Sequence, residues 1–214
     1  RAVLEQNGFD MSEAIAFGLN YSVSTSADSY EFQIGKALDR AHIPTDRFVP
    51  FNDIEYIDYT FDGADEVDHD LRMLKGHHGA ITRQRLVAAV SRRCVYLANE
   101  EKLVDHLGKK ALLAVTIIPF GISSTRNRLR DMGLSGVLRR TLDGEVFVTD
   151  GGGVLFDMRL PEQCNVEELA IALDHVPGVV DHGLFLDEAD EVLIECAKGT
   201  EINRMFPKVE AGER

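Results

Sequence analysis

The sequence has few cysteines and no hydrophobic run long enough to cross a bilayer. Its three cysteines, Cys94, Cys164 and Cys196, are widely spaced and form no Cys-x-x-Cys pair, which argues against a disulfide framework and a cysteine zinc site. The longest apolar run, residues 111–122, is too short for a membrane span, so we expect a buried strand there. No signal peptide is recognisable, although the chain opens on Arg1 and we expect residues upstream of it. A cytoplasmic protein that does not engage membranes is predicted.

Basic residues are also scarce. Asp and Glu number 36 against 23 Lys and Arg, which gives a formal net charge of −13. Such a surface repels the phosphates of nucleic acids and of anionic lipids, so we expect no nucleic-acid partner. A small anionic ligand can still bind where a few lysines and backbone amides form a local positive pocket.

The order of apolar and helical patterns predicts the fold class. With 214 residues, 44% of them apolar, the chain is long enough for one large domain and a smaller companion. An apolar run at 56–61, a helical pattern at 83–93 and an apolar run at 94–99 follow one another. This alternation is typical of a doubly wound, mostly parallel sheet. We therefore predict an α/β main domain built from residues 1–117 and 181–214.

Between residues 118 and 180 the pattern changes. Helical patterns at 123–133 and 165–176 enclose apolar stretches at 136–141, 146–150 and 154–160. The stretches are separated by an Asp-Gly pair and by three consecutive glycines, which are hairpin signals. This region is predicted to form a smaller α+β domain, an antiparallel sheet plus helices, inserted into the main one.

The segment FDGADEVD, residues 61–68, directly follows a predicted strand. Its carboxylates should therefore lie at the carboxyl end of that strand, where open α/β sheets bind ligands. Gly63 permits a sharp turn and close approach of a ligand. On one interpretation Asp62 and Asp65 face a single small polar ligand; on the other, the segment is an acidic turn in solvent.

Several short blocks around this segment occur in a distinctive order: DGADEVD, LKG, GAITR, ANEEK, IIP, VTDGGG and VPGVVDHGLF. In this order and at these separations they resemble ribose-5-phosphate isomerase of the A type, over about residues 21–199. The resemblance implies a doubly wound domain carrying a small α+β domain, assembled as a homodimer or homotetramer. It also implies interconversion of ribose 5-phosphate and ribulose 5-phosphate, with a small sugar phosphate as partner and no metal or organic cofactor.

Moving a proton between C2 and C1 of a sugar passes through an enediolate, which needs a base, a nearby cation and a proton shuttle. By resemblance, Asp62 and Asp65 correspond to the aspartates that serve ring opening and hydroxyl contacts. Lys75 corresponds to the lysine beside the developing charge, and Lys102 to a lysine near the phosphate. The substrate-binding and phosphate-binding set implied in the same way is Ser24, Thr25, Ser26, Gly63, Ala64, Gly76 and Lys102.

One departure from the family falls at the catalytic glutamate. The family block is T-R-E-K, whereas this chain reads TRQR, with Gln84 in place of the glutamate. A primary amide cannot take a carbon-bound proton at neutral pH. Thr82 is expected to cap the following helix, which would place Gln84 in its first turn.

Two further departures concern loops. His77 and His78 stand where the family has glycines; they are either a replacement base, since imidazole titrates near neutrality, or ordinary loop histidines. Adjacent histidines match no metal-ligand spacing, so no metal is predicted. The family's Gly-Thr-Gly-Ser-Thr phosphate loop has no counterpart in residues 1–20, where Asp10 occupies the corresponding region.

The first hypothesis is an aldose–ketose isomerase with reduced activity or an altered substrate. The second is a non-catalytic sugar-phosphate sensor or regulatory relative that has lost the base. A third hypothesis, a CoA-transferase or sugar-phosphate deaminase on a related scaffold, rests on fold analogy alone.

Overall fold

The computed structural model describes residues 51–162, 164–195 and 202–206. The chain divides into two compact units, Arg1–Glu55 and Tyr56–Arg214. Residues 51–55 are the described part of the first unit, with one 3-10 turn, η2, at Phe51–Asp53. Several residues considered above lie outside the described residues: Asp10, Ser24, Thr25, Ser26 and Cys196. All other elements belong to the second unit.

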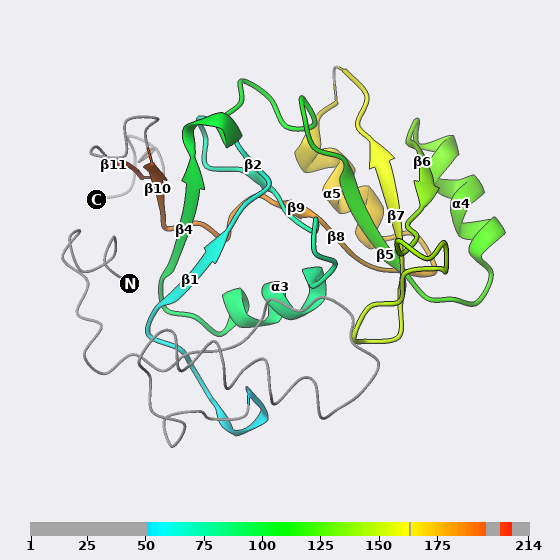
Figure 1. The fold of residues 1–214 in the computed structure, drawn as a ribbon, viewed down its shortest axis with the longest axis horizontal. Coiled ribbons are helices and arrows are strands. Elements are labelled where there is room, and N and C mark those ends of the chain that lie inside the picture. The colour runs from blue at the N-terminus through cyan, green and yellow to red at the C-terminus, as the bar shows by residue number, and fades with distance from the viewer. Residues whose placement is uncertain (1–50, 163, 196–201, 207–214) are drawn as a thin grey trace. The chain divides into compact units, whose positions relative to one another are not determined.

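The main sheet of the second unit is mostly parallel (Figure 1). Its strands, in spatial order, are β1 (Thr60–Gly63), β4 (Cys94–Asn99), β10 (Glu191–Glu195) and β11 (Ile202–Met205). The first three run parallel, and β11 is antiparallel to β10. The connection from β1 to β4 contains helix α3 (Ile81–Ala89), because parallel neighbours need a long crossover. The strand predicted at 94–99 and the parallel pairing are both confirmed.

A second, antiparallel sheet has the order β6-β7-β5-β8. It comprises β5 (Leu113–Ile117), β6 (Ser135–Leu138), β7 (Val154–Arg159) and β8 (Val179–His182). Helices α4 (Ile122–Asp131) and α5 (Val166–Asp174) accompany it. Asn165 is the N-cap of α5, and its side chain accepts hydrogen bonds from the amides of Glu167 and Glu168.

Three short strands form a further antiparallel sheet, in the order β2-β3-β9. They are β2 (Glu66–Val67), β3 (Met73–Leu74) and β9 (Leu184–Phe185). A 3-10 turn, η3 (Glu100–Lys102), follows β4. These short elements place the residues after β1 and β3 close to one another.

The two faces of β5 contribute to different parts of the core. Leu113, Val115 and Ile117 belong to a cluster that also contains buried residues of α4, α5 and β7. Ala114 belongs to a second cluster, with residues of β4 and β10. Because side chains alternate along a strand, β5 joins the antiparallel sheet to the packing of the main sheet.

The structure corrects two expectations for the middle of the chain. Residues 113–117 pair with β7 and β8 in the antiparallel sheet, although the sequence suggested a strand of the doubly wound domain. Residues 146–150 form no strand: Val146 and Val148 make isolated bridges to Arg140 and Val154. The Asp-Gly turn is present, with Gly144 at φ +84°. The α/β class stands, and the proposed domain limits at 118 and 180 remain a prediction.

Among the described residues, no helix is long and apolar enough to span a membrane.

Candidate active site

Asp62 lies near the carboxyl end of β1, paired in register with Tyr96 of β4. Its Oδ1 accepts a hydrogen bond from the Gly63 amide at 2.7 Å. Its Oδ2 lies 2.8 Å from the Nζ of Lys75. The carboxyl end of a parallel strand thus carries a carboxylate, as the position of FDGAD after an apolar run predicts.

Lys75 directly follows β3 and its side chain is only 2% exposed. Besides Asp62, its ammonium donates to the backbone carbonyl of Gly63. The Nζ also lies 5.2 Å from the ring centroid of Tyr96 and 5.5 Å from that of Phe185. A buried ammonium is tolerated only with such partners, so the fold holds a cation beside Asp62. Burial raises the pKa of the Tyr96 phenol well above its usual range, which keeps that ring neutral.

Gln84 joins the same cluster from helix α3. It lies in the first turn, is 9% exposed, and its Nε2 donates to Asp62 Oδ1 at 3.4 Å. The expected cap at Thr82 is wrong: the N-cap is Ala80, which offers no side-chain hydrogen bond. The amide hydrogen-bonds to Asp62, whereas a glutamate here would bring a second negative charge to the same oxygen.

Asp65 is tied to the loop that follows Lys75. Its amide donates to the Leu74 carbonyl at 2.8 Å, and its Oδ2 accepts from the His77 amide at 2.9 Å. Among the described residues, its Oδ1 receives no hydrogen bond. The second carboxylate therefore keeps one oxygen available for a ligand.

The loop tolerates two histidines because its tight positions are still glycines. A Cβ on Gly76 would lie 2.7 Å from the Ala114 Cβ, and one on Gly79 would lie 2.6 Å from the Phe147 ring. Both glycines have positive φ, +111° and +83°, which favours glycine. His77 and His78 are exposed, with their ring centroids 5.0 Å apart. Their side chains do not compete with the backbone for space.

Lys102 contacts the site through the backbone. It ends η3, and its Nζ donates to the carbonyl of Ala64 at 2.6 Å. Ala64 is itself 3% exposed and lies between Gly63 and Asp65. The structure therefore brings Lys102 to the DGAD turn from η3, the 3-10 turn that follows the neighbouring strand β4.

Two acidic neighbours that the sequence left unassigned have structural partners. Glu66 is fully buried and accepts hydrogen bonds from the amides of Gly108, Lys110 and Ala111. Asp68 binds Arg72 through its Nε at 2.7 Å. In DGADEVD the first two carboxylates, Asp62 and Asp65, belong to the site, and the last two, Glu66 and Asp68, have structural partners. Glu66, Val67 and Asp68 are all buried, and the two buried carboxylates have their hydrogen-bond acceptors satisfied.

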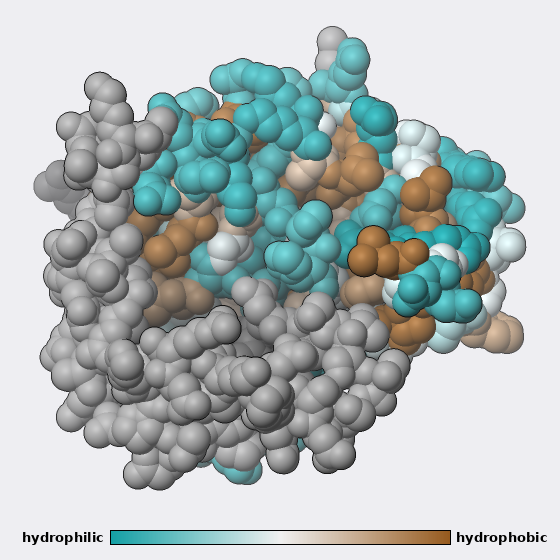
Figure 2. All heavy atoms as spheres, in the orientation of Figure 1, coloured by the Kyte–Doolittle hydropathy of each residue, from teal (hydrophilic) through white to brown (hydrophobic). Residues whose placement is uncertain are grey.

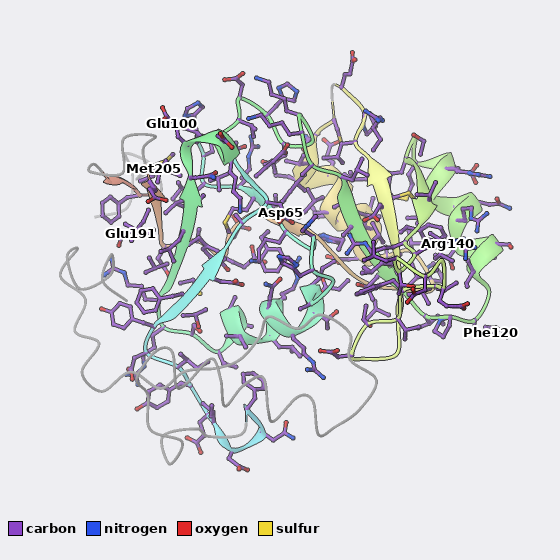
Figure 3. The ribbon with its side chains drawn as sticks, in the orientation of Figure 1. Asp65, Glu100, Phe120, Arg140, Glu191 and Met205 are labelled. Atoms are coloured by element: carbon purple, nitrogen blue, oxygen red, sulfur yellow. The ribbon has the colours of Figure 1, made fainter. Side chains whose placement is uncertain are left out.

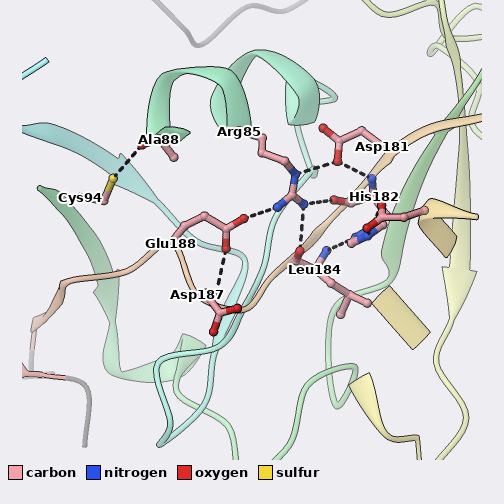
Figure 4. A network of polar contacts seen from close by, with 9 residues as sticks. Arg85, Ala88, Cys94, Asp181, His182, Leu184, Asp187 and Glu188 are labelled. Carbon is pink, nitrogen blue, oxygen red and sulfur yellow. Dashed lines mark hydrogen bonds and ion pairs between the residues drawn. The ribbon is translucent and has the colours of Figure 1, made fainter. Parts of the chain in front are cut away.

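Arg85, which follows Gln84, anchors helix α3 on the segment from β8 to β9 (Figure 4). Its Nε donates to Asp181 at 2.8 Å and its Nη1 to Glu188. Its Nη2 donates to the carbonyls of His182 and Leu184, at 2.7 and 2.9 Å. The guanidinium carbon also lies 4.1 Å from the Phe185 ring centroid. The sequence analysis assigned Arg85 no role, and its position next to Gln84 was the one local indication of its importance.

Among the described residues, no group of three or more His, Cys, Asp and Glu is arranged to hold a metal ion. The site consists instead of two carboxylates, a buried ammonium and an amide, carried by β1 and the turn after it, the loop after β3, and α3. This chemistry suits proton transfer on a polar organic ligand.

The parallel sheet, the carboxylates after β1 and the buried lysine after β3 define a metabolite-binding α/β protein with an acid–base site. A family model described as ribose 5-phosphate isomerase A (phosphoriboisomerase A) matches residues 23–199. Ribose-5-phosphate isomerase A of Rhodopseudomonas palustris strain TIE-1 is 43% identical over 159 residues, covering 72% of this chain and 68% of the relative. The chain belongs to the ribose 5-phosphate isomerase A family.

Solved structures agree. Ribose 5-phosphate isomerase A of Methanocaldococcus jannaschii superposes with a TM-score of 0.71 at 29% identity, covering 82% of this chain and 75% of that one. A D-ribose-5-phosphate isomerase solved in complex with phospho-erythronic acid superposes with a TM-score of 0.73 at 27% identity, with the same coverage of 82% and 75%. The predicted family and fold class are thereby confirmed.

Proposed function

We propose that this protein interconverts ribose 5-phosphate and ribulose 5-phosphate through an enediolate. The observation that carries the proposal is the buried Lys75 ammonium, 2.8 Å from Asp62 Oδ2, in a chain that belongs to the isomerase family. A fixed cation in a site of low dielectric stabilises negative charge that develops on the sugar oxygens. Family membership favours this activity over a non-catalytic sensor.

The two aspartates are proposed to serve the sugar hydroxyls. Asp62 is engaged by Lys75, Gly63 and Gln84, which suits a fixed hydrogen-bond acceptor. Asp65 has an oxygen without a partner among the described residues and is positioned to exchange a proton with a hydroxyl. Together with Lys75 they provide the ring-opening and charge-stabilising groups of the reaction.

Gln84 is proposed to limit the rate. Its amide can donate to an oxyanion but cannot accept the proton from C2. General-base catalysis by a placed side chain contributes roughly 100- to 10,000-fold. The proposed isomerase is therefore slower than a relative with a carboxylate at this position, and the remaining bases are Asp65 and the exposed His77 and His78.

A phosphorylated substrate is supported by Lys102 near the DGAD turn and by the relative solved in complex with phospho-erythronic acid. Ser24, Thr25 and Ser26 lie outside the described residues, and their role in phosphate binding stays a prediction from the family resemblance. Gly63 is exposed and supplies backbone that a ligand can approach, whereas Ala64 and Gly76 are buried and are proposed to support the binding loops from behind.

The deciding experiment follows ribulose 5-phosphate formation from ribose 5-phosphate, with free ribose as the comparison substrate. Wild type should turn over the phosphorylated sugar, and Lys75→Met should not. Binding of ribose 5-phosphate by calorimetry, without turnover in either wild type or Gln84→Glu, would instead establish the sensor function.

A homodimer or homotetramer in the cytoplasm is proposed as well. Large apolar side chains are exposed around the antiparallel sheet, among them Ile118 (43%), Phe120 (86%) and Val137 (68%). Figure 2 shows apolar surface on that side of the second unit. Exposed apolar patches commonly mark protein interfaces. Light scattering after gel filtration measures the assembly directly.

A further inference from the structure

Arg139 reaches the site from the antiparallel sheet. It follows β6, and its amide donates to the Leu155 carbonyl at 2.7 Å, continuing the pairing with β7. The Arg139 side chain is only 15% exposed. Its Nε lies 2.9 Å from Asp157 Oδ2 and its Nη2 donates to Asp157 Oδ1. This two-point pairing fixes the plane of the guanidinium.

The remaining guanidinium nitrogen binds the loop after Lys75. Arg139 Nη1 donates to the carbonyls of Gly76 and His77, both at 2.9 Å. The Phe147 ring lies 5.6 Å below the guanidinium carbon and presses against Gly79. Arg139 and Phe147 thus hold the two ends of the Gly76–Gly79 turn.

One peptide group links Arg139 to Asp65. The carbonyl of Gly76 accepts from Arg139, and the amide of His77, in the same peptide, donates to Asp65 Oδ2 at 2.9 Å. In a trans peptide these two groups point in opposite directions. The orientation that satisfies Arg139 is therefore the one that presents the N–H to Asp65.

We propose that Arg139 is a positioning residue of the isomerase site. It acts through the Gly76–His77 peptide to orient the Asp65 carboxylate and the loop that follows Lys75. Asp157 holds the guanidinium in place. A series of hydrogen bonds therefore runs from Asp157 in the antiparallel sheet, through Arg139 and the Gly76–His77 peptide, to Asp65 in the site. The kinetic part of this proposal rests on the proposed function.

The chain offers a matched control next to Arg139. Arg140 is exposed, and its Nη1 donates to the Gly144 carbonyl at 2.6 Å, in the turn after residue 141. In Figure 3 Arg140 lies on the antiparallel-sheet side, well separated from Asp65. Arg140→Met removes the same charge and side-chain type without touching the loop.

The test compares kcat and KM for ribose 5-phosphate in Arg139→Met, Arg139→Lys and Arg140→Met. Misplacement of a reacting group by about 1 Å can cost on the order of 100-fold in rate. Arg139→Met should lower kcat by about 10-fold or more, with a smaller change in KM, and Arg139→Lys should recover part of the loss. Arg140→Met should match wild type. Equal kcat in Arg139→Met and Arg140→Met would overturn the proposal.

Amide exchange at His77, followed by NMR, separates this proposal from the function itself. The His77 N–H should exchange about 10-fold faster or more in Arg139→Met than in Arg140→Met. If wild type had no turnover, the proposed function would fail, and equal His77 exchange in both variants would refute the positioning role. Should Arg139→Met not fold, Asp157→Asn weakens the same link and is judged by the same two measurements.

Discussion

Two cations contact the ring of Phe185, the buried Lys75 and the partly exposed Arg85, and they have different surroundings. Arg85 places its three nitrogens on four oxygens, from Asp181, Glu188 and two backbone carbonyls. Lys75 donates to two oxygens, of Asp62 and Gly63. The two cations lie 4.1 Å (guanidinium carbon) and 5.5 Å (ammonium nitrogen) from the ring centroid.

The difference lies in the hydrogen-bonding capacity that each region has left. The Arg85 network uses four of the five guanidinium N–H groups on protein acceptors, so it stabilises the packing of α3 on β8 and β9. The cluster around Lys75 keeps a donor on the ammonium and an oxygen on Asp65, within the described part of the chain. A network with most of its donors engaged supports structure, whereas a partly satisfied cluster leaves positions for a ligand.

Breaking the Arg85 network should have the largest effect. Arg85→Met leaves Asp181, 8% exposed, and Glu188, 18% exposed, without their cation. Loss of one partner from a buried ion pair typically costs about 3–5 kcal/mol. We expect the free energy of unfolding in urea to fall by about that amount.

Arg92→Met is the matched control for this change. The Arg92–Asp58 pair has a similar separation of 3.0 Å, but both side chains are more than 60% exposed. An exposed pair contributes about 0–1 kcal/mol. Equal destabilisation by the two variants would contradict the role assigned to the Arg85 network.

Lys75→Met, unlike Arg85→Met, should affect turnover more than stability. Asp62 would keep its bonds to the Gly63 and Gln84 amides and its partial exposure of 16%. The unfolding free energy should therefore fall by only about 1–2 kcal/mol. Loss of the cation beside the enediolate should lower kcat by about 100-fold or more. Steady-state kinetics and urea titration of the same preparations would test both numbers, and unchanged kcat would remove Lys75 from the mechanism.

Gln84→Glu should raise kcat while it lowers stability slightly. A carboxylate at position 84 supplies the missing base, and kcat should rise by about 10- to 100-fold. The new charge would lie near Asp62 Oδ1, which Gln84 Nε2 approaches to 3.4 Å, so stability should fall by about 1 kcal/mol. The measurement is kcat against pH for wild type and variant, with Gln84→Met as the control without a hydrogen-bonding group. A variant no faster than wild type would place the proton transfer on another residue, with His77→Ala and His78→Ala as the next variants to compare.

The smallest effect concerns His182, at the edge of the Arg85 network. Burial, and then the charge of Arg85, lower the pKa of this imidazole below its ordinary value of 6.5. Below pH 6.5 the unfolded chain binds the proton first, so stability falls as the pH decreases from 6.5 to the folded pKa. Above this window His182 is neutral in both states and contributes no pH dependence.

His182→Gln should therefore lose less stability than wild type between about pH 7.5 and pH 5.5. Urea midpoints at the two pH values give the difference, and the exposed His175→Gln controls for the substitution. A wild-type pH dependence that persists unchanged in His182→Gln would assign it to other groups.

Local patterns in the sequence determined much of what the structure contains. The run CVYLAN predicted β4 with its correct ends, and the helical pattern at 165–176 predicted α5, which spans Val166–Asp174. The turns DGAD and LKG both follow apolar segments, and the family resemblance implies that Asp62 and Lys75 share one site; the two lie in contact. These features depend on nearest neighbours along the chain or on turns at strand ends, where residue type and spacing carry the information.

Tertiary structure alone decided the rest. The apolar run at 111–117 fits a strand of either sheet, and its pairing with β7 and β8 followed from which partners bury both of its faces. The contact of Arg139 with Gly76 spans 63 residues, and that of Arg85 with Asp181 spans 96. Such contacts form because buried carbonyls and carboxylates must be satisfied by whichever donor the packing brings near. No local pattern in the sequence identifies that donor in advance.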